Sequence, residues 1–240
     1  MFLPQFRLKT AVQRFLCELQ ELRDFAADHP VREMRKRALA DTTDYITDHM
    51  DSAIGVYTPR QLLDLALDAV DGDGQFVEFG VFRGGSIRYI ASRAPNKIIH
   101  GFDSFEGLPE RWTGYNMEKG KFAMGGHLPR VPDNVRLHKG WFDATLPAWL
   151  AANPGPIAFC HIDCDLYTST KTAFDLLAPR MRPGTVIAFD EYFGYPSWRK
   201  HEFRAFQEFA ATHNVTYEYL AYSRIQVALR LSAIGAAPAG

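Results

Sequence analysis

Apolar residues in most of the chain fall into short blocks separated by stretches with helical spacing. Strands that alternate with helices predict a mostly parallel sheet covered on both faces, which is a three-layer α/β/α, Rossmann-like fold. The last two blocks are close in sequence, so we expect them to pair antiparallel at a sheet edge. The strands are predicted over residues 76–79, 97–102, 157–162, 185–189, 215–219 and 225–231, and the helices over 84–92, 168–177 and 200–212.

The N-terminal part of the chain is charged and helix-forming and lacks this alternation. Its apolar residues keep helical spacing from about residue 10 to residue 50, with an interruption at Pro30. Thr58 followed by Pro59 is typical of a helix start. We therefore predict an N-terminal helical segment, an α/β domain and a flexible tail, and the helical segment serves as a cover or as a homo-oligomer contact. These three parts span residues 1–57, 58–233 and 234–240.

A long segment rich in glycine, proline and aromatic residues interrupts the domain at 104–134. Loops of this length inside a compact domain are usually functional, so we predict a lid over a binding site. Tyr192, Tyr195 and Trp198 follow a predicted strand, and their pattern fits pocket lining and core packing equally well.

Composition narrows the classes of partner. The chain has 240 residues, with 27 Lys and Arg against 28 Asp and Glu, and this balance gives no electrostatic signature for nucleic acid or a membrane surface. No stretch approaches the ~20 apolar residues of a membrane span, and no signal-peptide pattern is present. Cys17, Cys160 and Cys164 show no C-x-x-C spacing, so we predict a cytoplasmic protein that acts on a small molecule.

A glycine-rich turn joins the first predicted strand to its helix. Glu78 precedes Gly80, Gly84 and Gly85, whose spacing departs from the dinucleotide fingerprint G-x-G-x-x-G. An acid before such a turn suits a ligand that carries both an ammonium and a carboxylate, such as the methionine end of S-adenosylmethionine, although a tight turn without a ligand is the alternative. Asp103 ends the next strand, where a carboxylate often holds ribose hydroxyls and can equally cap a helix.

Further carboxylates follow the next two predicted strands. Asp163, Asp190 and Glu191 should converge because the carboxyl ends of parallel strands meet at one edge of the sheet. An oxygen-only cluster of this kind favours Mg²⁺, Ca²⁺ or Mn²⁺ over zinc. Helix capping is the alternative role, most of all for Asp165. His161 lies within the strand, where a buried structural histidine is favoured over a catalytic base.

Together these segments resemble the macrocin O-methyltransferase family of metal-dependent class I methyltransferases, which modify sugars in antibiotic pathways. The resemblance covers about residues 61–231 and implies a seven-stranded sheet whose last strand is antiparallel. It rests on five motifs in order: Glu78-Phe-Gly80-Val-Phe-Arg83-Gly84-Gly85, Phe102-Asp103-Ser104-Phe105-Glu106-Gly107-Leu108-Pro109, Gly140-Trp141-Phe142-Asp143-Ala-Thr145-Leu146-Pro147, His161-Ile-Asp163-Cys-Asp165-Leu166-Tyr167 and Asp190-Glu191-Tyr192.

The resemblance also implies roles for single residues. A departure is Glu191, which stands where the family commonly has a second aspartate. Asp163 is implied as the base as well as a metal ligand, with Asp190 and Glu191 as the other two ligands. The implied cofactor-binding residues are Glu78, Gly80, Arg83, Gly84 and Ser86 around the methionine part, Asp103 with Ser104 at the ribose, and Phe142 with Asp143 in the turn at the adenine edge.

The sequence therefore predicts an S-adenosylmethionine-dependent, Mg²⁺-dependent O-methyltransferase. Its acceptor would be a hydroxylated small molecule such as a glycosyl or polyol group, methylated by SN2 transfer. Two alternatives stay open. The D-x-D motif formed by Asp163 and Asp165 fits a metal-dependent nucleotide-sugar glycosyltransferase, and a non-catalytic module could keep the cofactor pocket.

Overall fold

The computed structural model describes residue 16 and residues 29–235, so most of the helix predicted before Pro30 and the tail beyond residue 235 lie outside the described residues. The helices are α2 (Pro30–His49), α3 (Pro59–Asp68), α4 (Gly85–Arg93), α5 (Phe142–Ala152), α6 (Tyr167–Leu177) and α7 (Glu202–Thr212). The strands are β1 (Ile54–Gly55), β2 (Gln75–Phe79), β3 (Ile99–Asp103), β4 (Val135–Lys139), β5 (Ile157–Ile162), β6 (Val186–Phe189), β7 (Thr216–Tyr222) and β8 (Val227–Ala233).

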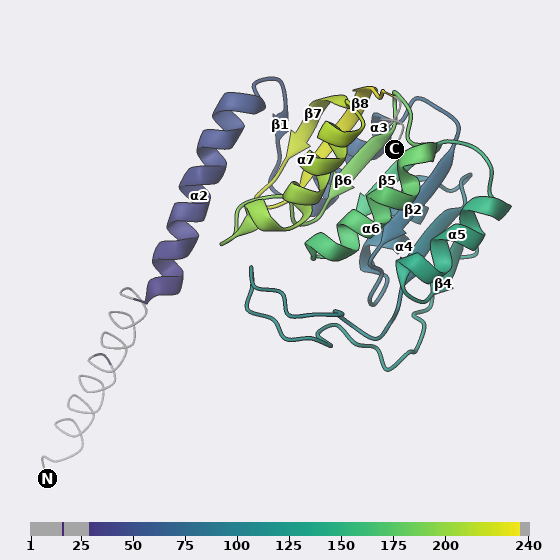
Figure 1. Cartoon of the computed structure of the whole chain (residues 1–240), viewed down its shortest axis with the longest axis horizontal. Coiled ribbons are helices and arrows are strands. Elements are labelled where there is room, and N and C mark those ends of the chain that lie inside the picture. The colour runs from purple at the N-terminus through teal and green to yellow at the C-terminus, as the bar shows by residue number, and fades with distance from the viewer. Residues whose placement is uncertain (1–15, 17–28, 236–240) are drawn as a thin grey trace, which may run out of the picture.

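Within the described residues the strands form one sheet in the order β1-β7-β8-β6-β5-β2-β3-β4 (Figure 1). Strands β2 to β6 run parallel, and β8 is antiparallel to both of its neighbours. The predicted fold class is thereby confirmed. The sheet has eight strands instead of seven because Ile54–Gly55 pairs with Ala221 and Tyr222 at the edge. The β7–β8 pair consequently lies between β1 and β6, so its predicted edge position is wrong.

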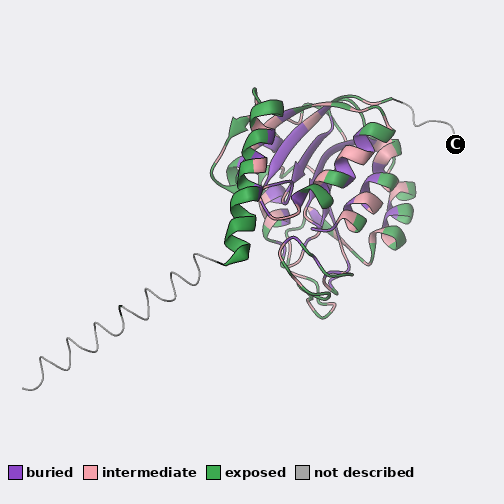
Figure 2. Ribbon diagram, turned by 60° about the vertical axis from the view of Figure 1, so that its left-hand side comes forward, coloured by how far each residue is buried: buried purple, intermediate pink, exposed green. Residues whose placement is uncertain are grey.

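Two separate hydrophobic cores fill the two faces of the sheet, since side chains alternate between faces along each strand. Phe159 points into the core beneath α3 and α4, whereas its neighbour Cys160 belongs to the core beneath α5, α6 and α7. Figure 1 shows these last three helices in front of the sheet, and Figure 2 shows the strands as the most buried part of the molecule. This arrangement leaves the carboxyl ends of the parallel strands free to build a site.

Strand β4 and helix α5 were not predicted by the hydrophobic pattern. In β4 only Val135 is fully buried, because the strand lies at the sheet edge and alternates apolar with basic residues. Helix α5 has Pro147 in its interior and no side-chain cap, so it lacks two usual helix signals. The expected turn at Phe142 and Asp143 is therefore the first turn of a helix.

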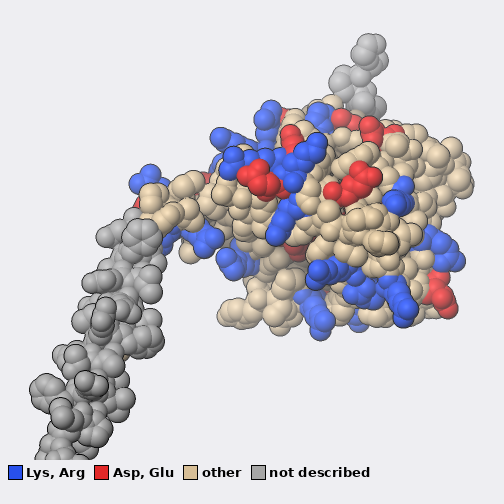
Figure 3. Space-filling view, turned by 90° about the horizontal axis from the view of Figure 1, so that it is seen from below, with Lys and Arg blue, Asp and Glu red and all other residues tan. Residues whose placement is uncertain are grey.

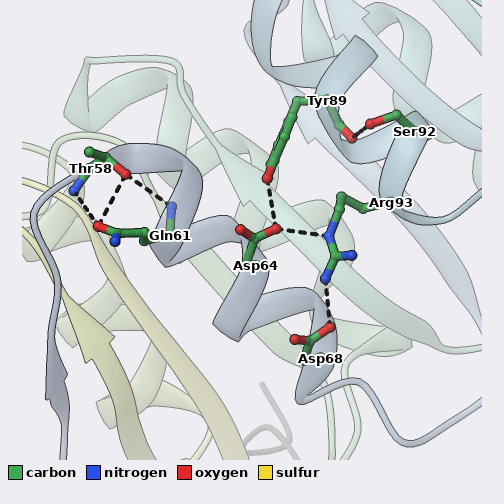
Figure 4. Close-up of polar contacts among 7 residues, drawn as sticks. All are labelled: Thr58, Gln61, Asp64, Asp68, Tyr89, Ser92 and Arg93. Atoms are coloured by element: carbon green, nitrogen blue, oxygen red, sulfur yellow. Dashed lines mark hydrogen bonds and ion pairs between the residues drawn. The ribbon is translucent and has the colours of Figure 1, made fainter.

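Local interactions fix α3 against the sheet and α4. Thr58 and Gln61 form a capping box, in which the Thr58 side chain accepts from the Gln61 amide and Gln61 accepts from the Thr58 amide (Figure 4). Further along α3, Asp64 accepts from the Tyr89 hydroxyl and lies 2.8 Å from Arg93 of α4. In the described part of the chain, no helix combines the length and apolarity that a bilayer span requires.

Helix α2 stands at the β1 end of the sheet and contacts the domain through its C-terminal half (Figure 1). Tyr45 is buried, and its hydroxyl lies 2.6 Å from that of Tyr219. The Thr42 side chain accepts from the backbone amide of Gly194. These contacts attach the helix to β7 and to the loop that follows β6.

The segment 104–134 forms a loop, but it packs closely on the domain. Phe105 and Trp112 are almost completely buried, and backbone hydrogen bonds join Leu108 to residues 120 and 121. Trp112 also exchanges backbone hydrogen bonds with Met117. The loop therefore has a folded base beside the strand ends, and its role as a lid stays a prediction.

Candidate active site

A cavity of about 710 Å³ lies at the carboxyl ends of β2, β3, β5 and β6. Its wall also includes the first turns of α4, α5 and α6 and part of the segment 104–134. Ligands of open α/β sheets bind at this position, because the strand order reverses there and leaves a crevice. The cavity brings together the glycine turn, Asp103 and the carboxylates after β5 and β6.

The glycine turn, residues 80–86, approaches the end of β5 so closely that only glycine fits at Gly80. A Cβ atom there would lie 1.7 Å from the backbone oxygen of Asp163, and the φ of Gly80 is +89°. Gly84 adopts φ +74° directly before α4. Gly80, Arg83 and Ser86 line the cavity, whereas Gly84 lies behind its wall.

Glu78 lies beneath the cavity and contributes no atom to its wall. Its side chain is fully buried, and Oε1 accepts a 2.7 Å hydrogen bond from the Ser86 hydroxyl. The other oxygen, Oε2, lies 3.5 Å from Nδ1 of His161 and accepts no hydrogen bond within the described residues. Contact between Glu78 and a ligand stays a prediction; in the structure the residue supports Ser86.

His161 is a buried residue of β5, as predicted for a structural histidine. Burial by itself lowers the pKa of the imidazole, but the Glu78 carboxylate and the charge of Asp190 raise it above the ordinary value. The imidazole is therefore held toward its charged form beside Glu78.

Asp103 is the organising carboxylate of the glycine turn. Its Oδ2 accepts from the backbone amides of Val81 at 2.8 Å and Phe82 at 2.7 Å, and its Oδ1 accepts from the amide of Phe105 at 2.7 Å. Because these bonds use most of its acceptor capacity, Asp103 retains acceptor capacity chiefly on Oδ1 for a ribose hydroxyl. It joins the turn after β2 to the start of the segment 104–134.

The remaining predicted cofactor residues lie on the same wall. Ser104, Phe142 and Asp143 all line the cavity, and Trp141 lies beside them with 41% of its surface exposed. An exposed indole and a phenyl ring at the mouth of a cavity suit a planar ligand such as adenine. Seven of the nine predicted cofactor residues thus line the cavity. The other two, Gly84 and Glu78, are neighbours of lining residues in the glycine turn and at the end of β2.

The acid cluster consists of Asp163, Asp165 and Glu191, whose oxygens come within 4.8 Å of one another. Asp165 takes the place that we predicted for Asp190. Asp190 lines the cavity as well, but its Oδ1 accepts from the side-chain amide of Gln226. Asp165 is not a helix cap, because α6 begins after Leu166 and has no side-chain cap.

Burial raises the pKa of Asp165 to about 8, and the charges of Asp190 and Asp103 add to this effect. The pKa values of Asp163 and Glu191 are also raised well above their usual range. Burial is the largest cause, and the charge of Asp190 is the second. Oε2 of Glu191 is buried and has no hydrogen-bond partner among the described residues. Crowded carboxylates with an unpartnered oxygen fit a divalent cation that prefers oxygen ligands.

This negative charge lies below the molecular surface. Asp165 and Glu191 are both buried, and the face seen in Figure 3 carries Lys and Arg side chains spread among Asp and Glu. The aromatic residues after Glu191 are also internal, because Tyr192, Tyr195 and Trp198 are almost completely buried and do not line the cavity. Of the two roles open to them, the structure supports core packing.

Glu202 is a buried carboxylate that sequence reasoning missed. It accepts hydrogen bonds from the backbone amides of Cys164, Asp165 and Glu191. Its position at the first residue of α7 is common for an acid and gave no signal of this role.

Comparison with known proteins agrees with this geometry. Residues 77–192 match the family model described as a methyltransferase domain. The chain is 34% identical over 147 residues to the 8-demethyl-8-(2,3-dimethoxy-alpha-L-rhamnosyl)-tetracenomycin-C 4'-O-methyltransferase of Streptomyces olivaceus, covering 52% of this chain and 54% of that protein. It is 27% identical over 173 residues to the demethyldecarbamoylnovobiocin O-methyltransferase of Streptomyces niveus, covering 63% of each.

Among solved structures, the calicheamicin methyltransferase CalS11 has a TM-score of 0.58 at 24% identity, covering 83% of this chain and 91% of that one. This likeness shows a common fold. The chain aligns with less than two thirds of the length of either curated relative above. The family match over residues 77–192 agrees with the resemblance to class I methyltransferases that the motifs carry.

Proposed function

We propose that the chain is an S-adenosylmethionine-dependent O-methyltransferase that uses Mg²⁺ and methylates a hydroxyl of a glycosyl or polyol group on a small molecule. The observation that carries the proposal is the single cavity shared by the glycine turn and the acid cluster. The two curated relatives named above, which are O-methyltransferases of antibiotic compounds, support the acceptor class.

The cofactor is expected to lie along the wall from the glycine turn to Trp141. The amides at the start of α4 and Ser86 would bind its methionine carboxylate, because the N-terminus of a helix favours an anion. Asp103 would accept from a ribose hydroxyl through Oδ1, and Trp141 and Phe142 would contact the adenine. The proposed set also includes Gly80, Arg83, Ser104 and Asp143 on this wall, and Gly84 and Glu78 next to it.

The acid cluster would hold the cation, and Asp190, which also lines the cavity, would serve as the further ligand that we predicted. When bound, Mg²⁺ supplies charge that lowers the pKa of a coordinated acceptor hydroxyl. Asp163, which lines the cavity, would then accept the hydroxyl proton. The acceptor oxygen forms its bond to the methyl carbon as the carbon–sulfur bond breaks.

The segment 104–134 is proposed as the lid that excludes water during transfer. Its residues Leu108, Pro109 and Phe122 line the cavity, which supports this role. We place the activity in the cytoplasm on the basis of cysteine usage, which the buried free thiols of Cys160 and Cys164 support.

We further propose that the N-terminal helical segment mediates homo-oligomer formation. Val31, Met34 and Leu39 of α2 are exposed, which supports a contact with a second copy. A monomer in sedimentation velocity at micromolar concentration would contradict this proposal.

Thermal shift and turnover measurements test the function. We expect S-adenosylhomocysteine to raise the melting temperature of the protein, and EDTA to abolish methylation of a glycosylated acceptor panel. A shift with UDP-sugars alone would favour the D-x-D glycosyltransferase, which is not favoured because the methyltransferase-domain match includes Asp163 and Asp165. Binding of S-adenosylhomocysteine without turnover of any acceptor would indicate a non-catalytic module, and unchanged turnover in EDTA would exclude the metal role.

A further inference from the structure

Glu202 links the two loops that carry the acid cluster. Its side chain is fully buried, and it belongs neither to the cavity wall nor to the cluster itself. Oε1 accepts from the amide of Cys164 at 3.3 Å and from that of Asp165 at 3.1 Å, while Oε2 accepts from the amide of Glu191 at 3.3 Å. One carboxylate therefore bonds the loop after β5 with one oxygen and the loop after β6 with the other.

The backbone alone does not hold these loops together. The ladder between β5 and β6 ends with the pair Ile162 and Phe189, followed by a hydrogen bond from the Asp190 amide to the Ile162 oxygen. Beyond that point, no backbone hydrogen bond among the described residues joins 163–167 to 190–193. The distance between the acids on the two loops thus depends on side chains, and Glu202 is the side chain that contacts both backbones.

Glu202 also contacts a residue whose backbone conformation is unusual, Asp165. Asp165 has φ +65°, in the left-handed region that residues other than glycine rarely adopt. Such a conformation persists where the surrounding structure fixes it, and the amide of Asp165 is one of the three that Glu202 holds. Glu202 therefore stabilises the backbone that turns the Asp165 carboxylate toward the cluster.

Packing alone does not explain a carboxylate here. Glu202 adds a negative charge beside Asp163, Asp165 and Glu191, which is unfavourable for a buried group. An acceptor with two oxygens is nevertheless the group that satisfies three amides from two directions. We propose that Glu202 is a positioning residue that sets the spacing between Glu191 and the acids after β5, and so the affinity of the cluster for a divalent cation. This inference rests on the proposed function, in which that cluster binds the cation.

Two substitutions of Glu202 separate the effect of its hydrogen-bond geometry from the effect of its charge. Glu202→Gln keeps the size but turns an NH₂ group toward at least one of the amides. Glu202→Asp keeps the charge but is one methylene too short to reach both loops. Glu208→Gln is the matched control, because Glu208 lies on the same helix and, among the residues that the structure describes, its hydrogen bonds are with Tyr167 and Arg204 near the surface.

Calorimetric titration of the full chain with Mn²⁺ alone provides the first readout. We expect both Glu202 variants to bind Mn²⁺ at least tenfold more weakly, as for other residues that orient metal ligands, and Glu208→Gln to match the wild type. The affinity for S-adenosylhomocysteine should stay within twofold, and kcat should fall at least tenfold while KM for S-adenosylmethionine is unchanged. Wild-type Mn²⁺ affinity in Glu202→Gln, or no Mn²⁺ binding by the wild type, would overturn the inference.

Amide hydrogen exchange followed by NMR gives a readout that depends on neither metal nor activity. In the wild type, the amides of Asp165 and Glu191 should be protected although they lie in loops, and in Glu202→Gln both should exchange at least tenfold faster while the amide of Gly80 is unchanged. Unprotected wild-type amides would overturn the inference even if the variants fail to fold. Faster exchange with unchanged Mn²⁺ affinity would show a structural role only, which also overturns it. A wild type that shows this protection but neither binds S-adenosylhomocysteine nor methylates any acceptor would contradict the proposed function and leave the Glu202 link in place.

Discussion

Asp103 and the acid cluster line the same cavity, but their carboxylates are partnered in opposite ways. Asp103 accepts three backbone amides, so its charge is compensated by the fold itself. In the acid cluster, Oε2 of Glu191 has no partner among the described residues, and three carboxylates crowd together. The first region is complete as the chain folds, whereas the second needs a cation to be electrostatically favourable. Substitutions in the two regions should therefore change stability with opposite signs.

Asp103→Asn tests the first region, in which the folded chain itself supplies the hydrogen-bond donors to the carboxylate. The substitution places an NH₂ group against backbone amides that need an acceptor, so we expect the free energy of unfolding to fall by about 4 kcal/mol. The melting-temperature rise caused by S-adenosylhomocysteine should also disappear. Urea denaturation and thermal shift measure the two effects, with the exposed Asp133→Asn as the control. Wild-type stability would show that the three amide bonds contribute little.

A histidine pair on the Asp103 side of the sheet predicts a pH dependence. Nδ1 of His100 lies 3.1 Å from Nε2 of His138. Burial lowers the pKa of His100 to about 4, and the neighbouring charges of His138 and Arg136 act in the same direction. His100 therefore binds fewer protons in the folded protein than in the unfolded chain between pH 4 and the ordinary histidine pKa of 6.5.

The stability that His100 contributes should accordingly be complete above pH 6.5 and fall by about 3 kcal/mol as the pH is lowered toward 4, whereas the acid cluster, whose pKa values are raised, contributes a slope of the opposite sign. His100→Phe should remove more than half of the difference that the pair contributes, whereas substitution of the exposed His127 by Gln should leave it unchanged. Urea denaturation at several pH values in EDTA measures the slope. A slope that is the same in the wild type and in His100→Phe would contradict this prediction.

Glu191→Gln tests the region that needs a cation. Removing one charge relieves the repulsion among buried carboxylates, so in EDTA we expect the variant to be more stable than the wild type by about 1 to 2 kcal/mol. Its Mn²⁺ affinity should fall at least tenfold, because a carboxylate ligand is lost. Thermal denaturation with and without Mn²⁺ measures both effects. A destabilised variant in EDTA would mean that the cluster is already compensated in the folded chain.

Thr58→Ala should have the smallest effect on the free energy of unfolding and serves as a reference for the substitutions in the cavity. Thr58 caps α3 at the surface, away from the cavity, so its loss should lower the free energy of unfolding by about 0.5 to 1 kcal/mol without changing ligand or metal binding. The neighbouring exposed residue Arg60 offers a control in Arg60→Lys, measured by the same urea denaturation. A change in S-adenosylhomocysteine affinity in Thr58→Ala would show that α3 is coupled to the cavity.

Much of the fold could be predicted from local pattern. The alternation of apolar blocks predicted the parallel strands β2, β3, β5 and β6 and the helices α4, α6 and α7, since each of these strands is buried on both faces. The pattern failed where burial is one-sided or the helix signals are weak, as at β4 and α5. It also could not predict β1, because two residues acquire strand geometry only through pairing with β7.

The candidate site, like the fold, could be predicted only in part from the sequence. Its location followed from the sequence, because the carboxyl ends of parallel strands must meet and the motifs at Gly80, Asp103 and Asp163 follow those strands. The sequence did not predict which of the acids lie together. Asp165 joins the cluster in place of Asp190 because its backbone takes the left-handed conformation, whereas Asp190 bonds to Gln226 of the loop between β7 and β8.

The sequence by itself determined the order of the buried strands β2, β3, β5 and β6 and of helices α4, α6 and α7, the methyltransferase motifs, and the edge of the sheet at which they meet, because these depend on spacing along the chain. Tertiary structure alone decided how each carboxylate is partnered. Glu202 is 37 residues from Asp165 and 11 from Glu191, yet it bonds to both backbones. Such contacts depend on how α7 packs on the sheet, and no local pattern of residues encodes them.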